Sequence, residues 1–142
     1  MKICYLNHDL KNTTGCGRFC LSLIKEIKNI LPEAQITVLT SEPAGHSLEK
    51  PILKNGIWRG LFSLPKIRRV FKECDVIHAL DGWPYGVIAV LASWGLKKKV
   101  VITAIGSGAV APLYSFWRRP IIKWAYRQAN KLTAISRNTK KE

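Results

Sequence analysis

Long hydrophobic runs are absent from the sequence. No window of about twenty apolar residues occurs, so no segment is long enough to cross a bilayer as a helix. The apolar residues 3–6 are too few for the hydrophobic region of a secretory signal, and polar residues follow them directly. A chain of 142 residues, 47% of them hydrophobic, can bury one core. We therefore predict one globular domain, located in the cytoplasm.

Acidic residues are also scarce. The chain has 9 Asp and Glu residues against 23 Lys and Arg residues, which gives a formal net charge of +14. Such a charge attracts anionic partners. Phosphorylated substrates, anionic lipid headgroups and nucleic acid all satisfy this requirement, and composition does not choose among them.

The cysteines form no metal or redox motif. No C-x-x-C pair occurs, and although Cys16 and Cys20 lie four residues apart on an expected helix, no further His or Cys lies near them in sequence to complete a metal site. Without a secretory signal, disulfides are not expected. We predict buried, reduced thiols and no bound metal.

Strand and helix patterns alternate along the chain. Short segments rich in strand-forming residues alternate with segments whose apolar residues recur at helical spacing. Strands are expected at 2–7, 36–40, 75–79, 99–104 and 132–135, and helices at 16–31, 65–74, 84–95 and 116–131. Ser136 is a favourable cap for a further helix, which would include Glu142. This alternation implies an α/β fold, a doubly wound, mainly parallel Rossmann-like sheet.

Two stretches have no regular pattern. Residues 41–60 are rich in Gly, Pro and charge, and we expect an irregular excursion there with a short strand at 51–53. Residues 106–112 are expected to form a glycine-rich loop.

The helix expected at 116–131 is both aromatic and basic. One face of this helix is predicted to pack on the sheet through Trp117, Ile121 and Trp124. The other face is basic and is formed by Arg119, Lys123 and Arg127. This basic face either contacts anionic lipid or is solvated.

The loop at 8–17 follows the first expected strand and is a candidate phosphate site. Ligands of doubly wound sheets bind outside the carboxyl ends of the strands. Gly15 and Gly17 precede a helix, where backbone N–H groups and the helix dipole suit a phosphate. The position three after Gly17 is Cys20, so the G-x-G-x-x-G fingerprint of a dinucleotide enzyme is incomplete. A tight turn is the alternative role of these glycines.

Two later strand ends carry polar or small residues. His78 lies near the end of one expected strand, and Asp81 and Trp83 follow it. The Asp81 carboxylate can accept a hydrogen bond from a sugar hydroxyl, and the Trp83 ring can stack on the face of a sugar. Gly106 and Ser107 follow the next strand and allow close approach of a ligand. The alternatives are a core histidine, an ordinary turn before Pro84, and a flexible connection.

Four segments in this order and spacing resemble the retaining glycosyltransferases of family 4. They are the opening strand with its glycine-rich turn, DVIHALD at 75–81, VVITAIGSGA at 100–109 and ANKLTAIS at 129–136. The family has the GT-B fold of two facing Rossmann-like domains, and the resemblance covers nearly the whole chain. It implies that residues 1–142 are the amino-terminal, acceptor-side domain, with Gly15 and Gly17 reaching the donor diphosphate.

The family's donor pocket has no counterpart in the sequence. The resemblance places an Arg/Lys pair and a Glu-x7-Glu motif in the second domain, and no two glutamates here are eight residues apart. We therefore expect a truncated chain that is inactive alone and that uses a UDP- or GDP-sugar as donor substrate, with no cofactor. Many members have a histidine where this chain has Ile105, so the catalytic residues stay unknown.

The resemblance also implies an acceptor site on this half. The acceptor is expected to be a saccharide or a lipid-linked molecule, which favours peripheral attachment to the inner face of the membrane. The candidate acceptor residues are His8, Asp9, His78, Asp81, Gly106 and Ser107. The alternative function is a non-catalytic, basic binding module for a membrane surface or nucleic acid, although no nucleic-acid motif is present.

Overall fold

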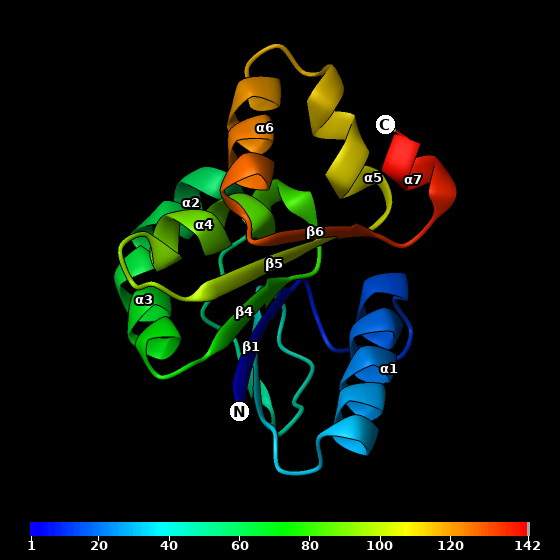
Figure 1. Cartoon of the computed structure of the whole chain (residues 1–142), viewed down its shortest axis with the longest axis vertical. Helices are drawn as coiled ribbons and strands as arrows, with labels where there is room; N and C mark the ends of the chain where they lie inside the picture. Colours follow the sequence, from blue (N-terminus) through cyan, green and yellow to red (C-terminus); the bar gives the residue numbers. More distant parts are fainter. Residues whose placement is uncertain (142) are drawn as a thin grey trace.

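A computed structural model describes residues 1–141 as a six-stranded parallel sheet covered by helices (Figure 1). The strand order is β3-β2-β1-β4-β5-β6. The strands are β1 (Lys2–Asn7), β2 (Gln35–Thr40), β3 (Glu49–Lys50), β4 (Val76–Ala79), β5 (Lys99–Ala104) and β6 (Lys131–Ala134). The chain runs from β1 to β3 in one direction and from β4 to β6 in the other. The winding therefore reverses between β1 and β4, which confirms the predicted doubly wound fold.

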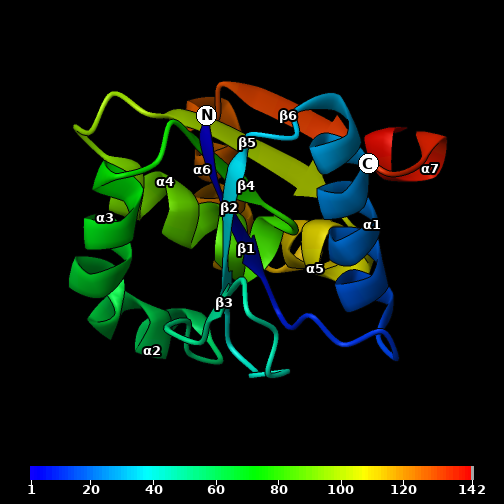
Figure 2. The ribbon, with the colours of Figure 1, turned by 90° about the horizontal axis from the view of Figure 1, so that it is seen from below.

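Helices lie on both sides of this sheet. Figure 2 shows α1 on one side and α2, α3 and α4 on the other. The helical segments are α1 (Gly15–Ile30), α2 (Ile57–Phe62), α3 (Leu64–Lys72), the π-helical turn η1 (Gly82–Gly86), α4 (Val87–Ser93), α5 (Gly106–Val110), the 3-10 turn η2 (Ala111–Tyr114), α6 (Arg118–Gln128) and α7 (Arg137–Lys141). Within residues 1–141, no helix combines the length and the apolar character that crossing a bilayer requires.

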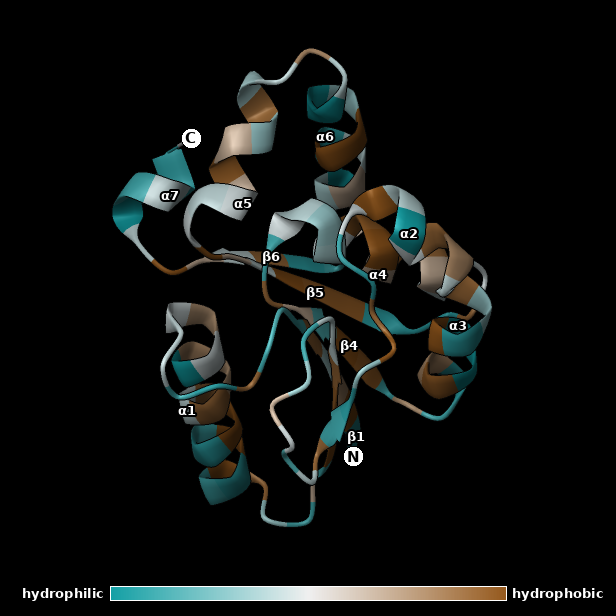
Figure 3. Cartoon of the chain, turned by 180° about the vertical axis from the view of Figure 1, so that it is seen from behind, coloured by the Kyte–Doolittle hydropathy of each residue, from teal (hydrophilic) through white to brown (hydrophobic). Residues whose placement is uncertain are grey.

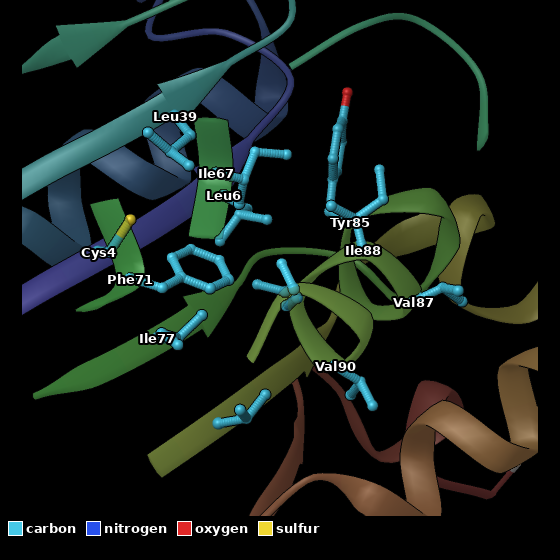
Figure 4. Packing of buried hydrophobic residues seen from close by; sticks show 14 of the residues in the cluster. Cys4, Leu6, Leu39, Ile67, Phe71, Ile77, Tyr85, Val87, Ile88 and Val90 are labelled. Carbon is cyan, nitrogen blue, oxygen red and sulfur yellow. The ribbon is translucent and has the colours of Figure 1, made fainter. Parts of the chain in front are cut away.

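The larger apolar core lies between the sheet and the helices α3 and α4. Phe71 of α3 and Ile88 of α4 are fully buried against Leu6 and Ile77 of the central strands (Figure 4). Central strands of a parallel sheet are covered on both faces, so β4 and β5 are largely hydrophobic along their length (Figure 3). The edge strand β6 has little cover, and Leu132 on it is exposed.

The expected helices and strands occur with small shifts, but three local predictions are wrong. The short strand lies at Glu49–Lys50 and not at 51–53, residues 57–62 form α2, and residues 106–114 form α5 and η2 in place of a loop. Glycine and serine disfavour α5, yet the helix packs against η1, which overrides their propensity. Ser136 caps α7 as expected by accepting a hydrogen bond from the Thr139 N–H at 3.1 Å, whereas Glu142 lies outside the described residues.

The predicted buried face of α6 is wrong in part. Trp117 and Ile121 are exposed, whereas Trp124 is partly buried against the core cluster, and Ile122 and Ala125 are fully buried. The reason is that α6 packs against η2, η1 and α4. Its buried face is therefore set by these neighbours, and the apolar contact is rotated by one residue. Aromatic surface therefore lies beside the basic residues of α6.

Candidate functional site

Three strand ends meet where the winding of the sheet reverses. His8 follows β1, Ser41 follows β2 and Tyr85 lies in η1 after β4. The Ser41 hydroxyl lies 2.9 Å from Nδ1 of His8 and 2.9 Å from the Tyr85 hydroxyl, and the His8–Tyr85 distance is 3.1 Å. Tyr85 packs its ring on the core while its hydroxyl points away from it (Figure 4). The sheet topology thus assembles a polar triangle from residues up to 77 positions apart.

An ion pair extends this triangle toward solvent. Nε2 of His8 lies 3.4 Å from the Glu42 carboxylate, which also accepts a hydrogen bond from Nζ of Lys11 at 3.0 Å. This bond raises the pKa of Lys11 and lowers the pKa of Glu42. His8, Asp9 and Glu42 offer ligand atoms that all lie within 4.8 Å of one another. Because the Lys11 ammonium already neutralises Glu42, the cluster gives no reason to assign a metal.

Asp9 is buried and organises the loop before α1. Its Oδ1 accepts hydrogen bonds from the Lys11 N–H at 2.8 Å and from the Thr14 hydroxyl at 2.6 Å. Thr14 in turn caps α1 by accepting a hydrogen bond from the Gly17 N–H at 3.1 Å. The structure therefore gives Asp9 a structural role in this loop, and its predicted contact with an acceptor stays a prediction.

Gly17 is packed tightly in this loop, whereas Gly15 is open. A Cβ on Gly17 would overlap the Lys11 carbonyl and approach Oδ1 of Asp9 at 2.5 Å and the Thr14 hydroxyl at 2.6 Å. A Cβ on Gly15 would meet nothing within 4 Å. Close packing therefore requires a glycine at position 17, whereas the surroundings of Gly15 leave room for a side chain.

Gly17→Ala is expected to destabilise the chain by about 1–3 kcal/mol, since the added methyl group must displace the capping loop. Gly15→Ala is the matched control and is expected to change the free energy of unfolding by less than about 1 kcal/mol. Urea denaturation of the two variants measures the difference. Equal stability of the two variants would show that the loop yields to the methyl group at no cost.

Asp81 is the most unusual carboxylate of the site. Its backbone has φ 153° and ψ 157°, a region that is occupied essentially by glycine and that costs about 1–3 kcal/mol in other residues. The side chain accepts a hydrogen bond from the Gly82 N–H at 2.7 Å and lies directly over Gly108 of α5, where any Cβ would overlap it. Burial raises the pKa of Asp81 to about 7. Asp81 thus joins the end of β4 to the start of α5.

The other predicted residues differ in exposure. His78 is half-buried; its Nε2 lies 2.7 Å from the Thr103 hydroxyl, and desolvation lowers its pKa to about 4. Gly106 begins α5 with a φ of 60°, and Ser107 beside it is exposed. Ile105, which stands where many family members have a histidine, packs with the apolar cluster beneath α1.

The sequence did not predict Ser41, Glu42, Lys11 or Tyr85 as site residues. Ser41 and Glu42 directly follow the second strand, so the rule that selected the other strand ends applies to them as well. Tyr85 was expected within a regular helix. Its position in η1, which turns the hydroxyl toward His8, has no local sequence signal.

The chain belongs to glycosyltransferase family 4. The family model, described as Glycosyltransferase Family 4, matches residues 13–142, which confirms the predicted resemblance. A comparison with curated protein sequences finds no match.

Two solved structures of Alr3699/HepE from Anabaena resemble this chain, one in complex with UDP and the other in complex with UDP-glucose. Each has a TM-score of 0.68 and 19% sequence identity, over 99% of this chain and 39% of the HepE chain. The likeness confirms the Rossmann-like fold. This chain spans about two fifths of the length of the structures that it matches.

Proposed function

We propose that this chain is the acceptor-side half of a glycosyltransferase that moves a sugar from a UDP- or GDP-sugar to a saccharide or lipid-linked acceptor, without a cofactor. The observation that carries the proposal is the polar triangle of His8, Ser41 and Tyr85, with Asp81, at the carboxyl edge of a sheet in a family 4 chain. Ligands of doubly wound sheets bind at this edge. Hydroxyl, imidazole and carboxylate groups together suit the hydroxyls of a sugar.

The start of α1 is proposed to face the donor diphosphate. Gly15 leaves the first turn of this 16-residue helix open to a ligand, and the helix dipole places positive charge there. HepE, which has the same fold in this region, was solved with UDP and with UDP-glucose. The remainder of the donor pocket is proposed to come from a second domain, so the 142 residues alone are expected to show no transfer.

A membrane-borne acceptor fits the surface of α6. Arg119 and Lys123 line a groove of about 660 Å³ together with Phe116, which is 97% exposed, and Arg127 is exposed further along the helix. Basic residues near an anionic surface each contribute roughly 1 kcal/mol to binding. We propose that this face makes a peripheral contact with anionic lipid.

His8→Ala tests the acceptor site in the two-domain enzyme. Loss of the imidazole removes a hydrogen-bonding group from the triangle, and a loss of about 1.4 kcal/mol corresponds to a roughly tenfold higher acceptor KM or lower kcat. The readout is steady-state sugar transfer at varied acceptor concentration. His46→Ala, in the exposed loop after β2, is the matched control. Unchanged KM and kcat in the His8 variant would contradict the proposed site.

A further inference from the structure

A basic pocket lies beside α2, outside the site described above. It has a volume of about 460 Å³ and is formed by the segment after β3, by α2 and by the start of α3. The residues that line it are Pro51, Ile52, Lys54, Arg59, Phe62, Ser63 and Lys66.

The charge of this pocket is not balanced. Lys54, Arg59 and Lys66 are all exposed, and within residues 1–141 no ion pair joins any of them to an acid. Three cations around one hollow repel one another, and an anion between them relieves that repulsion. The pocket therefore has the charge of a phosphate-binding site.

Two exposed aromatic side chains lie on α2. Phe62, which lines the pocket, is 88% exposed, and Trp58, which precedes Arg59 on the same helix, is 71% exposed. Their exposure does not result from a detached helix, because α2 packs its Gly60 against Ile88 so closely that a Cβ there would lie 2.6 Å from that side chain. The helix is thus anchored on α4 by glycine and presents both hydrophobic and hydrophilic residues (Figure 3).

The pocket adjoins the carboxyl edge of the sheet. The Leu53 N–H donates to the carbonyl of Thr40, the last residue of β2, at 3.0 Å, and Ser41 of the polar triangle follows directly. α2 also contacts η1, which holds Tyr85. A ligand in the pocket therefore lies close to the candidate acceptor site.

We propose that this pocket binds the phosphate of an anionic lipid headgroup in a membrane, while Trp58 and Phe62 lie among the headgroups. Cations paired with aromatic side chains favour a bilayer surface because aromatic rings prefer the interfacial region. The inference deepens the proposed function and rests on it: it names a second contact through which the domain lies on the membrane that carries the acceptor.

The test is co-sedimentation of the full 142-residue chain with vesicles of phosphatidylcholine, with or without phosphatidylglycerol, at low salt. One triple variant is Lys54→Gln/Arg59→Gln/Lys66→Gln. The matched control removes the same charge from the opposite edge of the sheet, with Lys97→Gln/Lys98→Gln/Lys99→Gln. We expect about a hundredfold weaker binding to anionic vesicles for the pocket variant, roughly fivefold for each cation, and a loss of less than about fivefold for the control.

Phe62→Ala separates insertion of the ring from net charge. It is expected to weaken vesicle binding severalfold while the charge stays unchanged. Equal losses in the two triple variants would overturn the proposal, because binding would then depend on net charge alone. Binding of single-stranded RNA is measured with the same variants. If the pocket variant loses RNA binding but keeps vesicle binding, the proposal is also overturned. Vesicle binding is measured without sugar transfer. A failure of the lipid-binding proposal can therefore be distinguished from a failure of the proposed transferase function.

Discussion

Asp81→Asn is expected to raise the free energy of unfolding at pH 8 by about 2–4 kcal/mol. The carboxyl group has a pKa of about 7 in the folded chain against 3.8 in a model compound. The folded state therefore holds this proton more tightly, and stability falls as the pH rises from about 4 to about 7. Above that pH the charged carboxylate stays partly desolvated, whereas the amide of Asn is neutral and its oxygen still accepts the Gly82 N–H.

Urea denaturation at pH 8 measures this effect without interference from His78. The pKa of His78 is lowered to about 4, so its charge affects stability only as the pH falls below about 6.5, and the imidazole is neutral in both states at pH 8. Asp75→Asn is the matched control, because Asp75 is exposed; its variant is expected to stay within about 0.5 kcal/mol. Equal stability of the Asp81 variant and the parent chain at pH 8 would mean that this carboxylate is solvated.

The same substitution is expected to lower sugar transfer by the two-domain enzyme at pH 8, where the carboxyl group is charged, about 10–100-fold. A hydrogen bond to a charged group is worth about 1.5–3 kcal/mol, and the proposed acceptor contact loses that charge. A variant that gains stability and loses activity is typical of a residue that serves function, because the charge of the parent residue destabilises the fold. Transfer at the parental rate would remove Asp81 from the proposed site.

The positions of the strands along the chain could be predicted because each buried strand has its own local pattern. Residues 3–6 and 100–102 are continuous apolar runs bounded by polar residues, and they form the centres of β1 and β5. The 16-residue α1 shows the helical period over four turns. Such signals need no tertiary information, and their alternation along the chain predicts a doubly wound, mainly parallel sheet.

The failures have tertiary causes. α2 and α5 span six and five residues, which is less than two helical turns, so no periodicity is visible in them. The buried face of α6 depends on which neighbour it meets, and the sequence alone did not show that the neighbour is α4. Each of these elements is decided by packing and not by its own pattern.

The candidate site was predictable in position but not in composition. His8 and Asp81 follow strands whose ends are adjacent in the sheet, so the edge rule finds them. The contact of Asp81 with Gly108, by contrast, depends on α5, which was expected to be a loop. The strand-end rule therefore locates the edge at which a ligand binds, while the helices after the strands decide which side chains reach it.

Phe71→Ala is expected to cost about 3–5 kcal/mol of stability. The ring is fully buried between α3 and the central strands, where it packs with Cys4, Leu6 and Ile77 (Figure 4). Its removal leaves a cavity that a sheet held from both faces cannot close, so the cost exceeds the transfer free energy of the ring alone. Thermal or urea denaturation of the 142-residue chain measures it.

Phe62→Ala is the matched control for this cavity, since the residue type is the same and the ring is 88% exposed. It is expected to change stability by less than about 0.5 kcal/mol. A loss of several kcal/mol in the Phe62 variant would mean that its ring packs on a covering surface and is not exposed for the membrane. If Phe62→Ala leaves stability intact but weakens vesicle binding, the ring contributes to contact with the bilayer and not to the fold, whereas Phe71 stabilises the core that holds α3 against the sheet.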